Sequence, residues 1–256
     1  MTDLRQRLDV VLTQRGTTTT RSLARRLIRE GRVLVDGAIE VRPGRLVAGD
    51  VGLRVEADLG LVGRGGEKLD AALAGFPLSV EGLEAFDAGA STGGFTQVLL
   101  RRGARSVTAV DVGRDQLARV LRNDQRVTVV EGLNLRDVDE TTFGRTFDVV
   151  VADLSFISLR LVVSGLSTVA APAAPLILLV KPQFEVGKAR LPRTGVVVNP
   201  DHRRDAVRSV AVAYEQAGWG VSAVLASPVP GTDGNRETFL LLRRGIPGIA
   251  VGEGIA

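Results

Sequence analysis

The alternation of strand and helix patterns after residue 64 constrains the fold more than any other feature. Short apolar runs typical of strands occupy residues 83–88, 106–111, 127–131, 147–152, 176–180, 219–225 and 237–243. Helical spacing of apolar residues occupies 67–75, 95–102, 114–122, 158–169 and 202–217. This order predicts an α/β fold with a mostly parallel, seven-stranded sheet and helices on both faces. The last two strands are joined by SPVPGTDGNR, too short for a crossover helix, which predicts an antiparallel hairpin at one edge.

The first 58 residues have a different pattern, which predicts a small α+β domain. Leu4, Leu8, Val11 and Leu12 follow helical spacing up to Gly16. A second helix is expected from Thr20, whose hydroxyl can cap it, to Gly31. A turn at Asp36-Gly37 and a closing strand at 51–56 complete the domain. The glycine-rich GLVGRGG marks a boundary, with a short linker at 59–63 and a second domain at 64–256.

Composition and hydropathy exclude several classes of protein. The chain has no cysteine, which excludes disulfides and cysteine-ligated metals. Its one histidine, His202, argues against a histidine-rich metal centre or a serine–histidine triad. The most apolar stretch, 159–180, contains Arg160, Pro172 and Pro175, so we expect a helix, a loop and a buried strand and no membrane span. The start of the chain does not resemble a secretory signal, and we expect a cytoplasmic protein.

Arginines crowd the N-terminal helices. Residues 5–32 hold eight arginines against Asp9 and Glu30. Arg21, Arg25 and Arg29 share one helical face at a spacing of four residues. A solvated face is the ordinary explanation of such a row, but like charges at this spacing destabilise a helix, which favours an anionic partner.

The first strand of the second domain ends in the glycine-rich FDAGASTGGF, where doubly wound sheets bind ligands. Its spacing is not GxGxxG, and the two following strand ends carry Asp111, suited to a ribose diol, and Asn134, suited to an adenine. S-adenosylmethionine, a sulfonium without phosphates, fits this pattern better than NAD. A side chain at Gly93 is expected to collide with the cofactor. The candidate cofactor-binding residues are Asp87, Gly89, Ala90, Ser91, Thr92, Gly93, Gly94, Asp111 and Asn134.

Lysine is rare, with three residues among 33 basic ones. Lys181 directly follows six apolar residues, so its ammonium must reach a cleft or a partner. Asp153 follows the apolar run DVVVA. Lys68 and Glu237 have ordinary alternatives, a solvated helix residue and a charge at a strand edge.

Longer motifs connect these observations to known families. RLDVVLTQRG and TRSLARRLIREGRVLVDG resemble the S4-type RNA-binding domain. RGGEKLDAAL, DAGASTGGFTQVLL, AVDVGRDQL, DLSFISL, KPQFEVGK and SPVPGTDGNRE resemble the TlyA family over almost the whole chain. The sequence departs from these patterns in the threonines before Arg21, in Asp36, and in RTGVVVNP.

The resemblance implies a Rossmann-like S-adenosylmethionine methyltransferase of the FtsJ type behind an S4 domain. That family is described both as methyltransferases of cytidine 2′-oxygens in ribosomal RNA and as haemolysins. Its catalytic set carries over as Lys68, Asp153, Lys181 and Glu237, in which lysine orients the hydroxyl or acts as base and the acids hold the lysines. No metal is needed, and the expected partner is ribosomal RNA or a ribosomal subunit. The RNA-contacting candidates are Arg5, Arg7, Arg21, Arg25, Arg26, Arg29 and Arg32.

Two rival functions stay open at this stage. One is a non-enzymatic RNA binder in ribosome assembly with a relic cofactor pocket. The other is a membrane-active haemolysin, since a row of arginines suits anionic lipid as well as nucleic acid.

Overall fold

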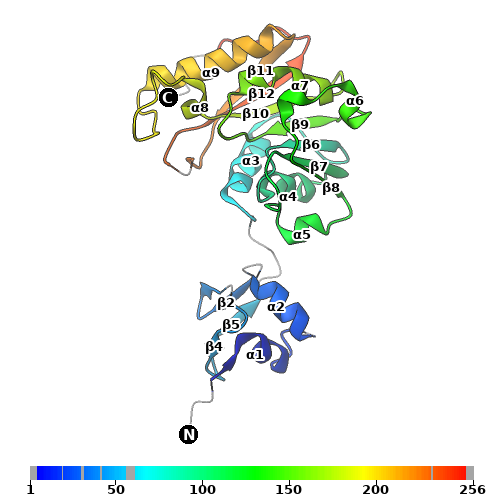
Figure 1. Ribbon diagram of the computed structural model, residues 1–256, viewed down its shortest axis with the longest axis vertical. Coiled ribbons are helices and arrows are strands. Elements are labelled where there is room, and N and C mark those ends of the chain that lie inside the picture. The colour runs from blue at the N-terminus through cyan, green and yellow to red at the C-terminus, as the bar shows by residue number, and fades with distance from the viewer. Residues whose placement is uncertain are drawn as a thin grey trace. The chain divides into compact units, whose positions relative to one another are not determined.

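The chain folds into two compact units, Met1–Gly60 and Leu61–Ala256 (Figure 1). The computed structural model describes residues 5–18, 20–29, 32–40, 42–55, 61–231 and 233–251. Leu4 and residues 59–60 of the expected linker lie outside these ranges. Each unit has a hydrophobic core of its own and is described separately.

The N-terminal unit packs two helices on small antiparallel sheets. Helices α1 (Leu8–Gln14) and α2 (Arg21–Arg29) supply most of the core. Strand β2 (Val33–Val35) pairs with both β3 (Ala38–Ile39) and β5 (Leu53–Val55), while β1 (Gln6–Arg7) pairs with β4 (Leu46–Val47). The core lies between the helices and these strands and contains Leu8, Val11, Leu12, Ala24, Leu27, Ile28, Val33, Val35 and Val47.

Local sequence signals explain the ends of these elements. Gly16, at φ 70°, ends the first helix, and the Thr20 hydroxyl accepts a hydrogen bond from the Leu23 N–H at the start of the second. Asp36 and Gly37 both have positive φ, as a two-residue hairpin turn requires. The first helix begins only at Leu8, because Gln6 and Arg7 pair as a strand with Val47 and Leu46, a partner that the helical spacing of leucines did not reveal.

The larger unit contains a seven-stranded sheet in the order β11-β12-β10-β9-β6-β7-β8. Neighbouring strands are parallel except around β12, which runs antiparallel to both β10 and β11. The predicted hairpin at one edge is therefore confirmed. The strands are β6 (Glu84–Ala88), β7 (Ser106–Asp111), β8 (Val127–Glu131), β9 (Val149–Ala152), β10 (Leu176–Val180), β11 (Trp219–Ala226) and β12 (Thr238–Arg244).

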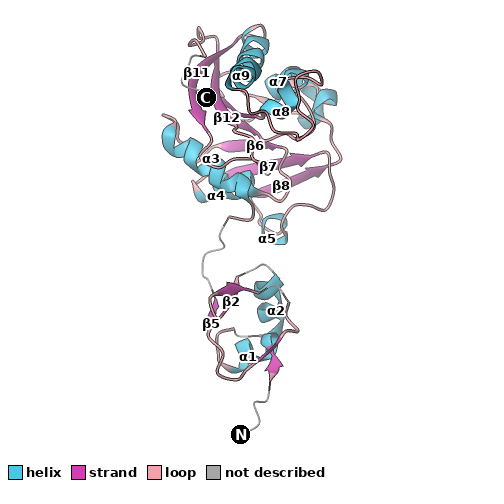
Figure 2. Ribbon diagram, turned by 90° about the vertical axis from the view of Figure 1, so that its left-hand side faces the viewer, coloured by secondary structure: helices cyan, strands magenta, loops and turns pink. Residues whose placement is uncertain are grey.

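Helices cover both faces of this sheet (Figure 2). One face is packed by α3 (Arg64–Gly75), α4 (Gly94–Arg101) and α5 (Arg119–Arg122). The other is packed by α7 (Val163–Val169) and α9 (Pro200–Glu215). Buried side chains alternate between these two cores along each strand, as in sheets enclosed on both sides.

Short elements follow several strand ends and were not anticipated from the sequence. They are η1 (Leu135–Asp137), α6 (Glu140–Phe143) and α8 (Pro182–Glu185). The helix expected over 158–169 is present as η2 (Leu159–Leu161) followed by α7. The stretch 159–180 is a helical segment, a loop and strand β10, as expected. Within the described residues, no helix is long and apolar enough to cross a membrane.

The helix expected over 114–122 is mostly a loop, and only Arg119–Arg122 is helical. Asp115 has a φ of 59°, and its N–H donates to the Glu131 carboxylate at 3.0 Å. This tertiary hydrogen bond holds the chain around the end of β7 and outweighs the local helical preference.

Candidate active site

A cavity of about 490 Å³ opens at the carboxyl ends of strands β6 to β9. This is the edge at which α/β sheets bind ligands. Asp111 and Asp153 contribute carboxylates to the wall, while none of the described residues lining it is a lysine or an arginine. The lining residues are Gly89, Ser91, Val110, Asp111, Val112, Gly113, Gln116, Leu133, Asn134, Leu135, Asp153, Leu154, Ser155, Phe156, Ile157 and Val162.

Gly89 is fixed by its surroundings as well as by its conformation. Its φ is 83°, and a Cβ there would lie 2.5 Å from the carbonyl oxygen of Asp153 on the neighbouring strand end. Only glycine allows the two loops to approach this closely. The close approach brings the Asp153 loop to the edge of the cavity.

Gly93 has a different role from the expected one. It also has a positive φ, 98°, but a Cβ there would overlap Leu121 and lie 2.8 Å from Leu117 Cδ1. The glycine therefore faces the apolar packing of α5, and the expected collision with a cofactor is replaced by a collision with the protein itself. Asp87, Ala90, Thr92 and Gly94 are likewise outside the cavity lining; Thr92 is exposed and the other three are buried.

Asp87 is fully buried at the end of β6. Its carboxylate accepts a hydrogen bond from the Thr96 hydroxyl at 2.6 Å. Burial raises the pKa of Asp87 to about 7, and the negative charges of Asp153 and Asp111 add to the effect. The hydrogen bond between Asp87 in β6 and Thr96 in α4 therefore joins the two elements that flank the glycine-rich loop.

Asp111 lines the cavity and is held rigidly. Its two carboxylate oxygens accept hydrogen bonds from the backbone N–H groups of Ser91 at 2.8 Å and Gly113 at 2.7 Å. Asn134 lies at the next strand end, where its side-chain oxygen caps η1 by accepting from the Arg136 N–H. The structure thus brings Ser91, Asp111 and Asn134 together around one cavity.

Lys181 lies next to this cavity in an ion pair with Asp153. Its ammonium is 2.7 Å from Asp153 Oδ1 and donates to the Ser155 hydroxyl at 2.9 Å. The lysine side chain is only 11% exposed, which explains why a cation can follow an apolar strand. Ser155 had not been singled out from the sequence, although it lies two residues after Asp153.

Lys68 and Glu237 form a second ion pair, more deeply buried than the first. The ammonium of Lys68 lies 2.6 Å from Glu237 Oε2, although the residues are 169 positions apart. Burial raises the pKa of Glu237, and the positive charges of Lys68 and Lys181 counter that rise. Lys181 and Asp153 both act on this carboxyl, so the two pairs form one electrostatic unit.

Phe156 is an aromatic residue at the cavity that sequence reasoning missed. Its backbone is left-handed at φ 65°, its side chain is 93% exposed, and its ring centroid lies 5.4 Å from that of Phe184. A bulky residue in this conformation is strained, and strain of this kind is concentrated at functional sites. Its position in the motif DLSF, three residues after Asp153, was the signal that could have found it.

Glu185 holds the loop that carries Phe156. Its buried carboxylate accepts hydrogen bonds from the Ser158 hydroxyl at 2.5 Å and the Leu159 N–H at 2.8 Å. Because Glu185 ends the short helix after Lys181, this contact ties the two strand ends together. Sequence reasoning missed this acid within KPQFE.

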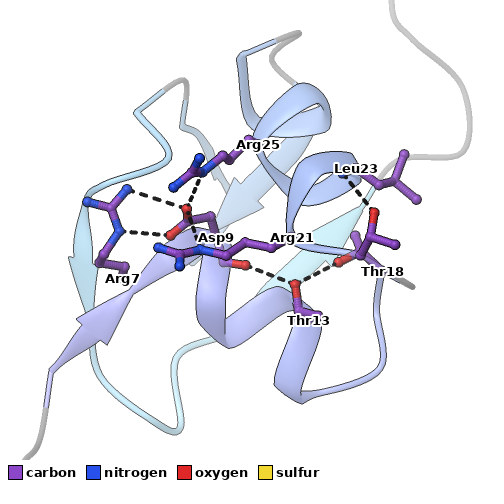
Figure 3. A network of polar contacts seen from close by, with 8 residues as sticks. Arg7, Asp9, Thr13, Thr18, Arg21, Leu23 and Arg25 are labelled. Carbon is purple, nitrogen blue, oxygen red and sulfur yellow. Dashed lines mark hydrogen bonds and ion pairs between the residues drawn. The ribbon is translucent and has the colours of Figure 1, made fainter.

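Three arginines of the N-terminal unit converge on one acid (Figure 3). Arg7, Arg21 and Arg25 each place their Nε atom 2.7–3.0 Å from the fully buried carboxylate of Asp9. Arg5 is exposed and Arg32 is half-buried. The side chains of the other two candidates, Arg26 and Arg29, lie outside the described residues. No group of three or more metal-ligating side chains occurs in the described part of the chain.

Both units match known families. Residues 61–244 match the FtsJ-like methyltransferase family, and residues 6–51 match the S4 domain. The chain is 46% identical to the 16S/23S rRNA (cytidine-2′-O)-methyltransferase TlyA of Mycobacterium tuberculosis over 93% of this chain and 90% of that protein. It is 33% identical to Hemolysin A of Brachyspira hyodysenteriae over 90% of this chain and 97% of that protein.

A solved structure from Streptococcus thermophilus, of a protein named after hemolysins, is also similar. It superposes with a TM-score of 0.72 and 35% identity, and covers 95% of this chain and 90% of that chain. The fold of the larger unit also resembles an S-adenosylmethionine-dependent methyltransferase from Mesorhizobium loti, with a TM-score of 0.52 and 18% identity over 72% of this chain and all of that one.

Proposed function

This chain belongs to the TlyA family, with an S4 domain before an FtsJ-like methyltransferase domain, and we propose that it methylates cytidine 2′-oxygens in ribosomal RNA. The observation that most supports this proposal is that two ion pairs, Lys68–Glu237 and Lys181–Asp153, are coupled beside a cavity that could bind a ligand. A ribosomal RNA substrate would also place the protein in the cytoplasm.

The cavity fits S-adenosylmethionine better than a dinucleotide. Its described lining includes two carboxylates and no lysine or arginine, which suits a cationic sulfonium and lacks the cations that phosphates attract. Asp111 would bind the ribose hydroxyls, Asn134 the adenine, and Leu133 and Leu135 would contact the faces of the ring. S-adenosylmethionine, when bound, supplies an electrophilic methyl group and leaves as a neutral thioether.

Lys181 would be the residue that acts on the ribose. An ammonium has three N–H donors; that of Lys181 donates one to the Ser155 hydroxyl and lies in an ion pair with Asp153. A remaining N–H can hydrogen-bond to the 2′-oxygen and stabilise the negative charge that develops as the hydroxyl releases its proton to water. Lys68 and Glu237 would hold the neighbouring side of the site, each neutralising the other in a buried setting.

Phe156 would receive the base of the target nucleotide. A nucleotide modified at its ribose must leave its stack to enter a cavity, and an exposed aromatic ring offers a face on which its base can stack. Phe156, which is 93% exposed at the cavity and has a strained backbone, offers such a ring.

Transfer to purified ribosomal RNA tests the proposal. The full chain, S-adenosylmethionine carrying a labelled methyl group and ribosomal RNA from cells lacking the protein should yield labelled 2′-O-methylcytidine after digestion. Lys181→Ala should yield none above background. Label on a base instead of a ribose would contradict the proposal, and cofactor binding without transfer to RNA or to either ribosomal subunit would favour a non-enzymatic assembly role. Leakage of anionic liposomes caused by the purified protein would favour the haemolysin alternative.

A further inference from the structure

Two buried carboxylates in the N-terminal unit are each surrounded by arginines. Asp9 is fully buried and binds Arg7, Arg21 and Arg25. Glu40 is 4% exposed and binds Arg42 at 2.9 Å and Arg45 at 2.7 Å. In both cases the acid lies beneath the surface, while the side chains of its arginines remain between 41% and 75% exposed.

The two groups are parts of one surface. The backbone N–H of Asp9 donates to the carbonyl of Pro43, and that of Leu8 donates to the carbonyl of Arg45. The guanidinium of Arg7 lies against the turn between Arg42 and Arg45, where a Cβ on Gly44 would be 3.0 Å from Arg7 Nη1. We call this set the arginine surface; its members are Arg7, Arg21, Arg25, Arg42 and Arg45.

The balance of charge on this surface favours an anionic partner. Five guanidinium groups face two carboxylates, so an excess of three positive charges remains on exposed side chains. Burial acts to raise the pKa of both acids, and hydrogen bonds from the arginines lower it in spite of that. Both acids therefore stay ionised while lying out of reach of an approaching phosphate.

We propose that Asp9 and Glu40 are positioning residues, which hold five arginines in a fixed array for the phosphates of an RNA backbone. The turn at residues 42–45 belongs to this array, although the sequence pointed only to arginines before residue 33. An arginine that gives one or two of its N–H groups to a buried acid keeps the others for a second acceptor and loses less side-chain freedom on binding. This inference rests on the proposed function in taking RNA as the partner.

The sign of one effect separates positioning from simple electrostatics. Asp9→Asn keeps the shape of the side chain and adds one positive charge to the surface. If Asp9 only repelled phosphates, the variant would bind RNA more tightly. If Asp9 positions arginines, its new amide N–H groups face guanidinium donors, the array loosens, and RNA binding weakens.

The experiment measures binding of the full chain to transcribed large-subunit ribosomal RNA across a salt titration. We expect Asp9→Asn and Glu40→Gln each to weaken binding several-fold and to flatten the salt dependence by about 1 for each phosphate that is no longer neutralised. Asp124→Asn, which neutralises an arginine-bound acid in the methyltransferase unit, is the matched control and should leave binding unchanged. Unchanged or tighter binding by both Asp9→Asn and Glu40→Gln would overturn the proposal.

Two further variants separate a loss of stability from a loss of phosphate contacts. Leu12→Ala destabilises the core of the same unit without touching an arginine, so it should not change the salt dependence of the folded protein. Arg42→Gln with Arg45→Gln tests the turn directly and should flatten the salt dependence by about 2. An unchanged slope for this double variant would remove the turn from the surface, whatever happens to Asp9→Asn.

Methyl transfer to the same RNA is measured in parallel. Weaker binding by Asp9→Asn, together with no methyl transfer by the wild-type protein to this RNA or to either ribosomal subunit, would support the arginine array and refute the enzymatic function. Normal transfer by the wild-type protein, together with unaltered RNA binding by Asp9→Asn and Glu40→Gln, would support the enzymatic function and refute the arginine array.

Discussion

The two units of this protein combine acids and bases in opposite ways. In the N-terminal unit, each buried acid is outnumbered by exposed or half-exposed arginines, three around Asp9 and two around Glu40. In the methyltransferase unit, Asp153 and Glu237 each pair with one lysine, and all four side chains are 18% exposed or less. An excess of exposed positive charge suits binding of a polyanion, whereas balanced buried pairs suit the positioning of a reacting atom.

The pKa directions follow this difference. The arginines lower the pKa of Asp9 and Glu40, while burial raises that of Glu237 despite its lysine partner. Asp87, whose hydrogen bonds come from Thr96, has its pKa raised to about 7 by burial. Asp9, Glu40 and Glu237 are all buried, so the number of hydrogen-bonding cations around each acid, and not burial alone, decides the direction of its pKa shift.

Replacing Lys181 should have the largest effect on the reaction. Lys181→Arg keeps the charge but spreads it over a planar group that cannot occupy the same position, so the rate of methyl transfer should fall by about 10²–10³-fold. Single-turnover transfer to ribosomal RNA with saturating cofactor measures this. Lys188→Ala, in an exposed turn, is the control and should stay within a few-fold of wild type. A near-normal rate for Lys181→Arg would show that positive charge alone suffices.

The second largest effect is expected on stability, from the Lys68–Glu237 pair. Lys68→Met leaves a buried carboxylate without its cation and should lower the free energy of unfolding by about 3 kcal/mol. Adding Glu237→Gln should restore most of that stability without restoring methyl transfer. Urea denaturation measures the first effect, and single-turnover transfer measures the second.

A variant in the arginine surface is the comparison for the stability of Lys68→Met. Arg21→Gln removes one of three half-exposed partners of Asp9, and exposed pairs contribute at most about 1 kcal/mol. A loss of stability as large as that of Lys68→Met would contradict the division into a binding surface and a buried site.

Gly89 tests the close approach of the two loops at the cavity. Gly89→Ala should push the Asp153 backbone away, and because such overpacking costs about 1–3 kcal/mol, S-adenosylmethionine should bind about tenfold more weakly. Gly144→Ala has a similar backbone conformation, with φ 61° and open space around it, so it should affect stability but not cofactor binding. Calorimetric titration of both variants with the cofactor decides between local strain and loss of the site.

The pH dependence of stability due to Asp87 is a separate test. Between its ordinary pKa of 3.8 and about 7, the folded protein holds a proton that the unfolded chain has released. This carboxyl therefore makes the protein less stable as the pH rises through that range, by at most about 1.4 kcal/mol per pH unit. Asp87→Asn removes this contribution, so the difference in free energy of unfolding between variant and wild type should grow as the pH rises from about 4 to about 7.

Asp124→Asn should show a weaker trend of the opposite sign. Hydrogen bonds from Arg126 lower the pKa of Asp124, so its contribution to stability is present above its ordinary pKa and is lost on acidification. Parallel slopes for the two variants would contradict the assignment of a raised pKa to Asp87.

Regular elements were predictable where local patterns decide them. Strands β7, β8 and β10 coincide with the apolar runs, and the turn at Asp36-Gly37 has the expected positive φ values. The expected helix at 114–122 was wrong because a contact between Asp115 and Glu131, 16 residues apart, replaced it with a loop. Local propensity carries no information about such a partner.

The sequence by itself determined which chemistry is available to this protein: a glycine-rich strand end, three lysines in an arginine-rich chain, and acids after apolar strands. Only the tertiary structure decided which charge meets which. Folding paired Lys68 with Glu237 across 169 positions. It also placed Asp9 in contact with the arginines; in the sequence, Asp9 is only one negative charge among them. The physical reason is that charges interact through space at distances near 3 Å, and chain packing alone brings together groups that are remote in sequence.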